Sequence, residues 1–311
     1  MSAPAVDPAT MLVDAAWLRE RLGDPSVAVL ESTVSIARAS DRGDGGAAHR
    51  SGREAWAAGH VPGSRFVDLL AEASDPDDPL PFTLPPAQLL EQALRGHGVR
   101  RDQTIVVYDR DHNIWAARLW WLIRAHGHAN VVVLDGGWRA WTLAGGPVAT
   151  DVPPVVAGDF AARPQPGWWA SRDDVLAAMR DEATCLLSAQ TSVQYEGLDA
   201  GGASPGGRIP GSVNVHARTL TDPDTQRFLD PLALAERLGA VGALGAQRTI
   251  AYCGAGIAAA GDAFALRLLG ADDVRVFDGG MSEWAADGRL PVERGPVPGL
   301  VHSAASRGAD A

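Results

Sequence analysis

Residues 131–141 read VVVLDGGWRAW, and residues 274–284 repeat the pattern as VRVFDGGMSEW. Two more blocks recur in the same order: GHVPGSRFVDL at 59–69 returns as GRIPGSVNVHA at 207–217, and QTIVVYD at 103–109 returns as QRTIAYC at 247–253. The offset between matching blocks runs from 143 to 148 residues, which is far longer than one unit of a solenoid. The sequence therefore predicts one domain present in two copies.

Each copy has the pattern of an α/β domain. Short apolar runs rich in β-branched residues indicate buried strands: Val27–Leu30, Ile105–Tyr108, Val131–Leu134, Leu186–Leu187, Ile250–Tyr252 and Val274–Phe277. Helix-like segments alternate with them: Ala87–His97, Ile114–His126 and Ala258–Leu269. This alternation predicts, in each copy, a mostly parallel sheet flanked by helices. We place the domains at residues 1–145 and 165–311, joined by a Pro- and Gly-rich linker at 146–164.

Composition excludes several classes of function. The 311 residues carry a net charge of −11 with no basic run, which argues against nucleic acid or an anionic membrane as partner. No signal-peptide pattern opens the chain, and no apolar run approaches the roughly 18 residues of a membrane span. Two cysteines, Cys185 and Cys253, cannot build a disulfide framework or a four-cysteine zinc site. We expect a cytoplasmic protein without metal or other cofactor.

Cys253 stands where Asp109 stands in the first copy, directly after a predicted strand. A small, glycine-rich loop follows it: Gly254, Ala255, Gly256, Ile257 and Ala258. Such a loop before a helix lets backbone N–H groups converge on one point, so we expect a stabilised thiolate with a lowered pKa. Most free cysteines are simply buried apolar residues, and Cys185, on an apolar strand with no such loop, is predicted to be one.

The two copies together resemble the tandem rhodanese-like sulfurtransferases over nearly the whole chain. The matching segments are Trp56-x-x-x-His60-Val61-Pro62-Gly63, Gly207–Ser212, the two Asp-Gly-Gly-x-x-x-Trp segments and Cys253–Ala258. The resemblance implies two rhodanese-like domains with the active site between them. It also implies that the first domain is catalytically silent, with Asp109 in place of a working cysteine.

The resemblance further implies covalent sulfur transfer by Cys253. Its thiolate would take a sulfane sulfur from a small-molecule or protein donor, hold it as a persulfide, and pass it to a thiol acceptor. The neutral loop is similar to that of 3-mercaptopyruvate-using members, but Ala255 and Ala258 replace hydroxyl residues. A phosphatase would need arginine at the sixth position after the cysteine, where this chain has Ala259.

The predicted donor pocket departs from the family pattern. Two arginines that hold the donor's carboxylate in the family correspond to Gln190 and Gln194, which cannot form arginine's charge-assisted fork. Asp68 matches a family acid near the domain interface, and Arg208 and Trp115 are further candidates for the pocket. Three interpretations stay open: a sulfurtransferase with a changed donor, a degenerate member with poor turnover, and a sulfur-carrier or binding protein without true turnover.

Overall fold

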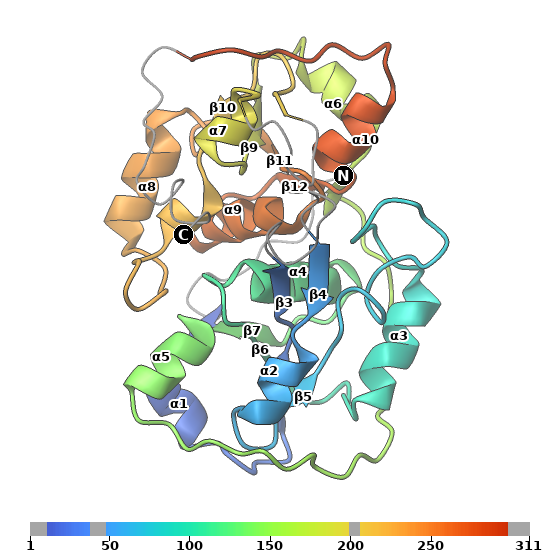
Figure 1. The fold of residues 1–311 in the computed structure, drawn as a ribbon, viewed down its shortest axis with the longest axis vertical. Coiled ribbons are helices and arrows are strands. Elements are labelled where there is room, and N and C mark those ends of the chain that lie inside the picture. Colours follow the sequence, from blue (N-terminus) through green and yellow to red (C-terminus); the bar gives the residue numbers. More distant parts are fainter. Residues whose placement is uncertain (1–10, 38–47, 199–205, 298–311) are drawn as a thin grey trace.

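The computed structural model describes residues 11–37, 48–198 and 206–297 (Figure 1). The first sheet is entirely parallel. Its strands, in spatial order, are β1 (Leu12–Val13), β7 (Val131–Leu134), β6 (Thr104–Tyr108), β2 (Val27–Glu31) and β5 (Arg65–Phe66). The apolar runs expected from the sequence form the three inner strands, which are buried on both faces as parallel strands require.

The second sheet repeats the first and is again parallel throughout. Its strands, in the matching order, are β8 (Trp169–Ala170), β12 (Val274–Phe277), β11 (Arg248–Tyr252), β9 (Thr184–Ser188) and β10 (Val213–Asn214). The predicted fold class, two parallel-sheet domains flanked by helices, is confirmed.

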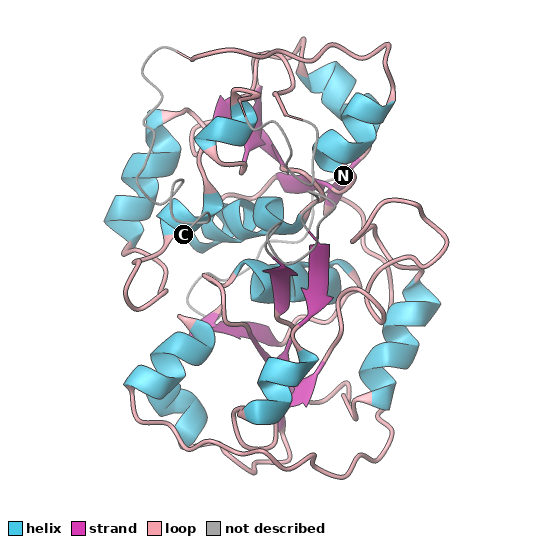
Figure 2. Ribbon diagram, in the orientation of Figure 1, coloured by secondary structure: helices cyan, strands magenta, loops and turns pink. Residues whose placement is uncertain are grey.

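Helices cover both faces of each sheet (Figure 2). Those of the first half are α1 (Ala15–Arg19), α2 (Arg53–Ala58), α3 (Ala87–Gly96), α4 (Ile114–Ala125) and α5 (Gly137–Leu143). Those of the second half are α6 (Arg172–Ala178), α7 (Ser192–Tyr195), the 3-10 helix η3 (Ala217–Leu220), α8 (Pro231–Ala240), α9 (Ile257–Leu268) and α10 (Gly280–Ala286). The first half also carries an antiparallel pair, β3 (Val34–Ala37) and β4 (Ala48–Ser51).

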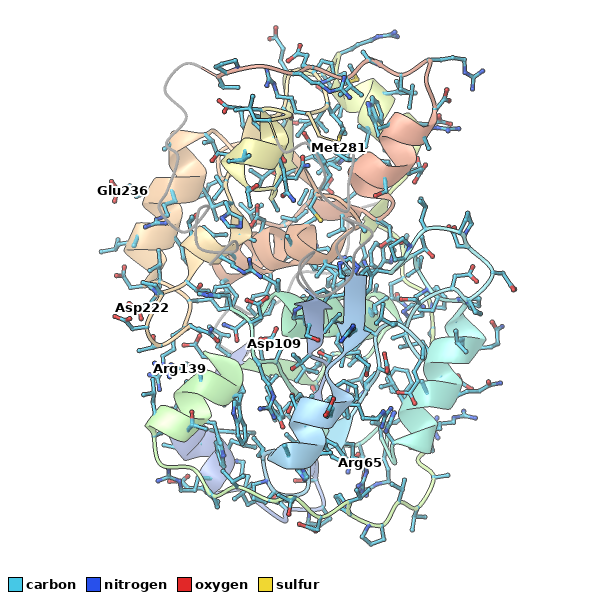
Figure 3. All side chains as sticks on the ribbon, viewed as in Figure 1. Arg65, Asp109, Arg139, Asp222, Glu236 and Met281 are labelled. Atoms are coloured by element: carbon cyan, nitrogen blue, oxygen red, sulfur yellow. The ribbon has the colours of Figure 1, made fainter. Side chains whose placement is uncertain are left out.

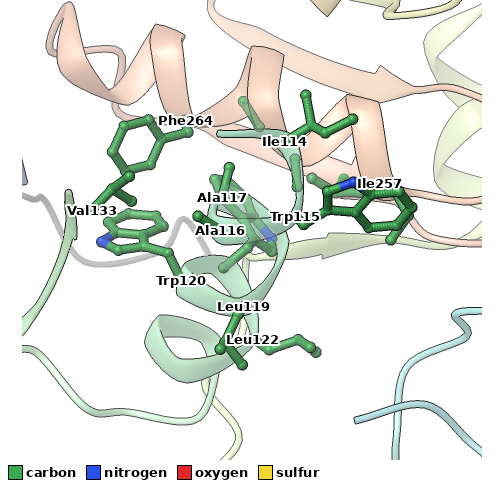
Figure 4. Close-up of a cluster of buried hydrophobic side chains, with 14 of the residues drawn as sticks. Ile114, Trp115, Ala116, Ala117, Leu119, Trp120, Leu122, Val133, Ile257 and Phe264 are labelled. Carbon is green, nitrogen blue, oxygen red and sulfur yellow. The ribbon is translucent and has the colours of Figure 1, made fainter. Parts of the chain in front are cut away.

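Helices α4 and α9 pack against each other where the two halves meet (Figure 4). Both are apolar around nearly their whole circumference because each lies between its own sheet and the other helix. Phe264 of α9 meets Trp120 of α4 edge to face, with ring centroids 4.9 Å apart. One continuous apolar core therefore runs from one half into the other through these two helices.

The duplication extends to individual hydrogen bonds. The phenol of Tyr108, the last residue of β6, bonds the hydroxyl of Ser64 at 3.0 Å. The phenol of Tyr252, the last residue of β11, bonds the hydroxyl of Ser212 at 2.7 Å. The residues that follow these two tyrosines are thus held at equivalent places, at the carboxyl end of the central strand in each half.

Candidate active site

Cys253 leaves β11 at its carboxyl end, and its thiol lies inside the loop that leads into α9. The side chain is only 5% exposed. Four backbone N–H groups of the loop and the first turn of the helix hydrogen-bond the sulfur: those of Ala255, Gly256, Ala258 and Ala259. The convergence of amides expected from the glycine-rich sequence is therefore present in the structure.

Two glycines give this loop its shape. Gly256 adopts φ 72°, in the left-handed region, and turns the chain into α9. Gly280, at φ 52°, begins α10 beneath the loop, and a Cβ there would lie 2.4 Å from the carbonyl oxygen of Cys253. The close approach lets the amide of Met281 donate to that carbonyl at 2.8 Å. The repeated Asp-Gly-Gly segment is thus the support on which the cysteine loop rests.

The pKa of Cys253 differs from the sequence-based expectation. Burial raises the pKa of the thiol above its ordinary value, and the four amides oppose this rise without overcoming it. The expected lowered pKa is wrong because the thiol belongs to the core shared by both halves, where desolvation outweighs the amide hydrogen bonds. The amides are placed to stabilise the anion that forms when the thiol proton leaves.

The corresponding loop of the first half is filled by the carboxylate of Asp109. Its Oδ1 accepts from the amides of Asp111 at 2.8 Å and Asn113 at 3.1 Å. Its Oδ2 accepts from the amides of Trp115 and Ala116, both at 2.8 Å. A loop of this construction thus holds a two-oxygen anion with four backbone hydrogen bonds.

The two loops differ in length by one residue. The left-handed residue that begins the helix is Asn113, four positions after Asp109, and Gly256, three positions after Cys253. Burial raises the pKa of Asp109 to about 7, although its amide partners oppose the rise. Figure 3 shows Asp109 close to the junction of the two halves.

Gln190 lies on the same sheet edge as Cys253. It follows β9, the neighbour of β11, and the amide of the preceding Ala189 donates to the carbonyl of Tyr252 at 2.8 Å. Its side chain is 3% exposed, and its Oε1 accepts from the hydroxyl of Ser188 at 3.1 Å. The Nε2 donor is buried and has no hydrogen-bond partner among the described residues. An unused neutral donor therefore lies where the family pattern has an arginine.

Gln194 has a different role. Its Oε1 accepts from the amide of Thr191 at 3.2 Å, while the hydroxyl of Thr191 accepts from the amide of Gln194 at 3.2 Å. This reciprocal pair is a capping box that begins α7. The Oε1 of Gln194 is committed to the helix end, whereas Gln190 has a buried donor without a partner among the described residues.

Trp115 lies on the face of α4 that meets the cysteine loop. Figure 4 shows its indole beside Ile257, the first residue of α9. The side chain is 2% exposed, and its Nε1 donor has no partner among the described residues. Phe82 packs against it, with ring centroids 5.5 Å apart. The first half thus contributes an aromatic wall with one unused N–H group.

The other two candidate pocket residues are engaged in local structure. The Oδ1 of Asp68 accepts from the amide of Leu70 at 3.0 Å, which closes a turn after β5. The guanidinium of Arg208 pairs with Glu293 at 3.2 Å and donates to the carbonyl of Gly295 at 3.0 Å. These contacts tie Arg208 to the segment after α10, and none of them connects it to the thiol.

Cys185 lies on β9 and packs, partly buried, against the shared core. Burial raises the pKa of this thiol to about 11. Among the residues that the structure describes, no backbone amide opposes that rise, so the packing role predicted for Cys185 fits its surroundings.

The sequence reasoning missed Arg118, which interrupts the apolar run of α4. The structure buries it against Asp278 of the second half, beside Gly256 of the cysteine loop. A charged residue in the middle of an otherwise apolar helix was the available signal.

A duplicated parallel-sheet fold with one cysteine held by loop amides defines the class of tandem rhodanese-like sulfurtransferases. The Rhodanese family, a rhodanese-like domain, matches residues 14–144 and 171–287. The chain is 30% identical to a 3-mercaptopyruvate sulfurtransferase of Escherichia coli, over 91% of this chain and 98% of that protein. It is 34% identical to a putative thiosulfate sulfurtransferase, SseB, of Mycobacterium tuberculosis, over 78% of this chain and 86% of that protein. The chain belongs to the Rhodanese family and is a sulfurtransferase.

Solved structures show the same fold. The 3-mercaptopyruvate sulfurtransferase SseA from Escherichia coli superposes with a TM-score of 0.75 at 27% identity, covering 87% of this chain and 98% of that one. An anaerobic ergothioneine biosynthesis enzyme from Chlorobium limicola superposes with a TM-score of 0.80. The superposition covers 94% of this chain and 72% of that one. At 22% identity it shows a shared fold and nothing further.

Within residues 11–37, 48–198 and 206–297, no group of three or more His, Cys, Asp and Glu side chains could hold a metal ion. In the same part of the chain, no helix is long and apolar enough to cross a membrane.

Proposed function

We propose that Cys253 carries the transferred sulfur as a persulfide in a two-step reaction. Its thiolate attacks the terminal sulfur of a donor, and the bond from that sulfur to the rest of the donor breaks, with the electron pair leaving on the donor. An acceptor thiolate then attacks the outer sulfur, and the Cys253 thiolate returns. One transfer is thereby divided into two easier displacements.

The observation that carries this proposal is the ring of four amides around the Cys253 sulfur. These N–H groups favour negative charge on the sulfur, so they stabilise the thiolate and the charge that develops as it reacts. The first half supports the same interpretation, because its loop holds the Asp109 carboxylate through four amides. The carboxylate carries its charge on oxygens one bond beyond Cγ, and a persulfide anion carries its charge on a sulfur one bond beyond Sγ, so amides arranged in this way suit both groups.

We propose that the donor is less anionic or larger than thiosulfate, and includes organic or protein-bound persulfides. The two unused donors near the loop, on Gln190 and Trp115, are neutral N–H groups. The arginine next to the loop, Arg118, is neutralised by Asp278 at 2.5 Å. Ala255 and Ala258 offer the loop only their amides. These groups suit a hydrogen-bond acceptor of low charge better than a small dianion.

A carrier without turnover is the less favoured alternative, since the matched relatives carry the names of sulfurtransferases. The test is intact-mass spectrometry of the protein after exposure to a panel of sulfur donors, followed by a chase with a thiol. We expect one added sulfur atom on the wild type and on Cys185→Ser, none on Cys253→Ser, and its loss during the chase. An adduct that survives Cys253→Ser but not Cys185→Ser overturns the assignment, and an adduct that the thiol cannot remove supports the carrier.

A further inference from the structure

Arg118 of α4 projects from the first half into the second. Its side chain is 1% exposed, and its Nη1 pairs with Oδ1 of Asp278 at 2.5 Å. Its Nη2 donates to the carbonyl of Phe82, and its guanidinium carbon lies 5.0 Å from the ring centroid of Trp169. The other oxygen of Asp278, Oδ2, accepts from the amide of Leu84 at 2.5 Å. A buried ion pair thus fastens two segments of the first half to the turn after β12.

This ion pair is in contact with the amide ring of the cysteine loop. A Cβ on Gly256 would lie 2.8 Å from the carbonyl oxygen of Asp278, 3.0 Å from its Oδ1 and 3.1 Å from Nη1 of Arg118. The glycine whose amide points at the Cys253 sulfur is therefore packed directly on the pair. If the pair moves, the direction of that N–H group moves with it.

The pseudo-symmetry of the chain provides an internal comparison. Asp135 occupies in the first half the place of Asp278 in the second, and it accepts from the amide of Phe228 at 2.9 Å as Asp278 accepts from Leu84. The helix position that matches Arg118 is Gly261 of α9, which has no side chain to offer. Each side of the junction therefore has a hydrogen bond from a backbone amide of one half to an aspartate of the other. The arginine is present only on the side of the cysteine.

We propose that Arg118 is a positioning residue by which the first half holds the amide ring around Cys253 in its working geometry. The inference rests on the proposed persulfide mechanism. It gives the half without a cysteine a part in the reaction: Arg118 fixes Asp278, and Asp278 fixes Gly256. Because the amides act on charge that develops in the transition state, the effect falls on the rate of sulfur transfer more than on donor binding.

The experiment compares Arg118→Gln and Arg118→Lys with a matched control, Arg218→Gln. Arg218 also forms an ion pair across the junction, with Asp111 at 2.5 Å, on the side of Asp109. The rate of persulfide formation is measured by rapid quench and intact mass, over a range of concentrations of one donor that labels the wild type. Thermal unfolding of each variant is measured in parallel.

We expect Arg118→Gln to lower the limiting rate by about 10²-fold with little change in the half-saturating donor concentration. Arg118→Lys restores part of the rate, because the charge remains while the fork is lost. Arg218→Gln keeps the wild-type rate even where it lowers the unfolding temperature. The positioning role is overturned if all three variants keep the limiting rate of the wild type. It is also overturned if Arg118→Gln and Arg218→Gln lose the same fraction of that rate.

Asp278→Asn extends the test if Arg118→Gln does not fold. It keeps the shape of the side chain and an oxygen for the amide of Leu84 but removes the charge that holds Arg118. We expect a reduced limiting rate here too, and a wild-type rate in this folded variant overturns the proposal. A wild type that forms no sulfur adduct on Cys253 refutes the proposed function itself, whereas adduct formation at equal rates refutes only the role of Arg118.

Discussion

Asp109 and Cys253 occupy the same place in the two halves, each following the central strand and each held by four backbone amides. One loop holds a carboxylate and the other a thiol. The first half thus keeps the anion-binding loop of the second but fills it permanently with its own side chain.

The buried carboxyl of Asp109 makes stability depend on pH. Its pKa in the folded chain is about 7, against roughly 4 in an unfolded chain, so the folded state binds more protons between these values. Its contribution to stability is complete below about pH 4 and is lost as pH rises through about 7. We expect Asp109→Asn to remove this loss, as measured by urea unfolding from pH 4.5 to 8.

The difference between wild type and variant isolates this group from others that titrate nearby. Burial lowers the pKa of His216 to about 4, which gives a contribution of the opposite sign in the same range. Asp224→Asn, at an exposed site, controls for the change in net charge. Parallel pH profiles for wild type and Asp109→Asn contradict the prediction.

The donor pocket can be tested at Gln190. We expect values of kcat/KM below about 10⁴ M⁻¹s⁻¹ with thiosulfate and with 3-mercaptopyruvate, because Gln190 is neutral and Arg118 is paired with Asp278. Gln190→Arg adds a guanidinium at the sheet edge that carries Cys253, and we expect it to raise kcat/KM for 3-mercaptopyruvate about 10-fold. The measurement is steady-state kinetics with both donors at constant ionic strength.

Gln194→Arg is the matched variant. The same substitution breaks the capping box of α7, so we expect a loss of about 1 kcal/mol in stability and no gain in activity. An equal gain from both substitutions would mean that both side chains face the donor. No gain from Gln190→Arg would place the carboxylate site elsewhere.

The fold was predictable because its signals are local and occur twice. Short runs of β-branched residues predict the buried strands. The glycine-rich loop after Tyr252 identifies Cys253 as the candidate nucleophile from local sequence alone. The role of Gln194 was also within reach, since Thr191-x-x-Gln194 has the form of a capping box.

Other parts of the site depend on contacts that sequence spacing does not contain. Arg118 and Asp278 are 160 positions apart, and only the packing of α4 on α9 brings them together. The raised pKa of Cys253 has the same origin, because the first half completes the core that desolvates the thiol. Arg208 is paired with Glu293 because the segment after α10 runs back alongside Arg208, and the sequence does not show this.

Gly280 is expected to tolerate no side chain. Its φ of 52° and the 2.4 Å from its Cβ position to the Cys253 carbonyl oxygen combine strain with a backbone clash. We expect Gly280→Ala to destabilise the chain by more than about 1 kcal/mol and to slow sulfur loading. Gly239→Ala, in α8 with open space around it, is expected to stabilise by about 0.5–1 kcal/mol. Urea unfolding of the two variants measures whether the free energy of unfolding falls in Gly280→Ala and rises in Gly239→Ala.

Asp262 of α9 is a buried carboxyl whose two oxygens have no hydrogen-bond partner among the described residues. Burial raises its pKa well above the ordinary value, so the folded state favours the protonated acid. Its contribution to stability therefore diminishes as pH rises above the unfolded value of roughly 4. We expect Asp262→Ala to increase the free energy of unfolding by about 1–2 kcal/mol at pH 7, and by less at pH 5. Urea unfolding at the two pH values measures both numbers, and a variant less stable than wild type at pH 7 shows that the carboxyl has a stabilising partner.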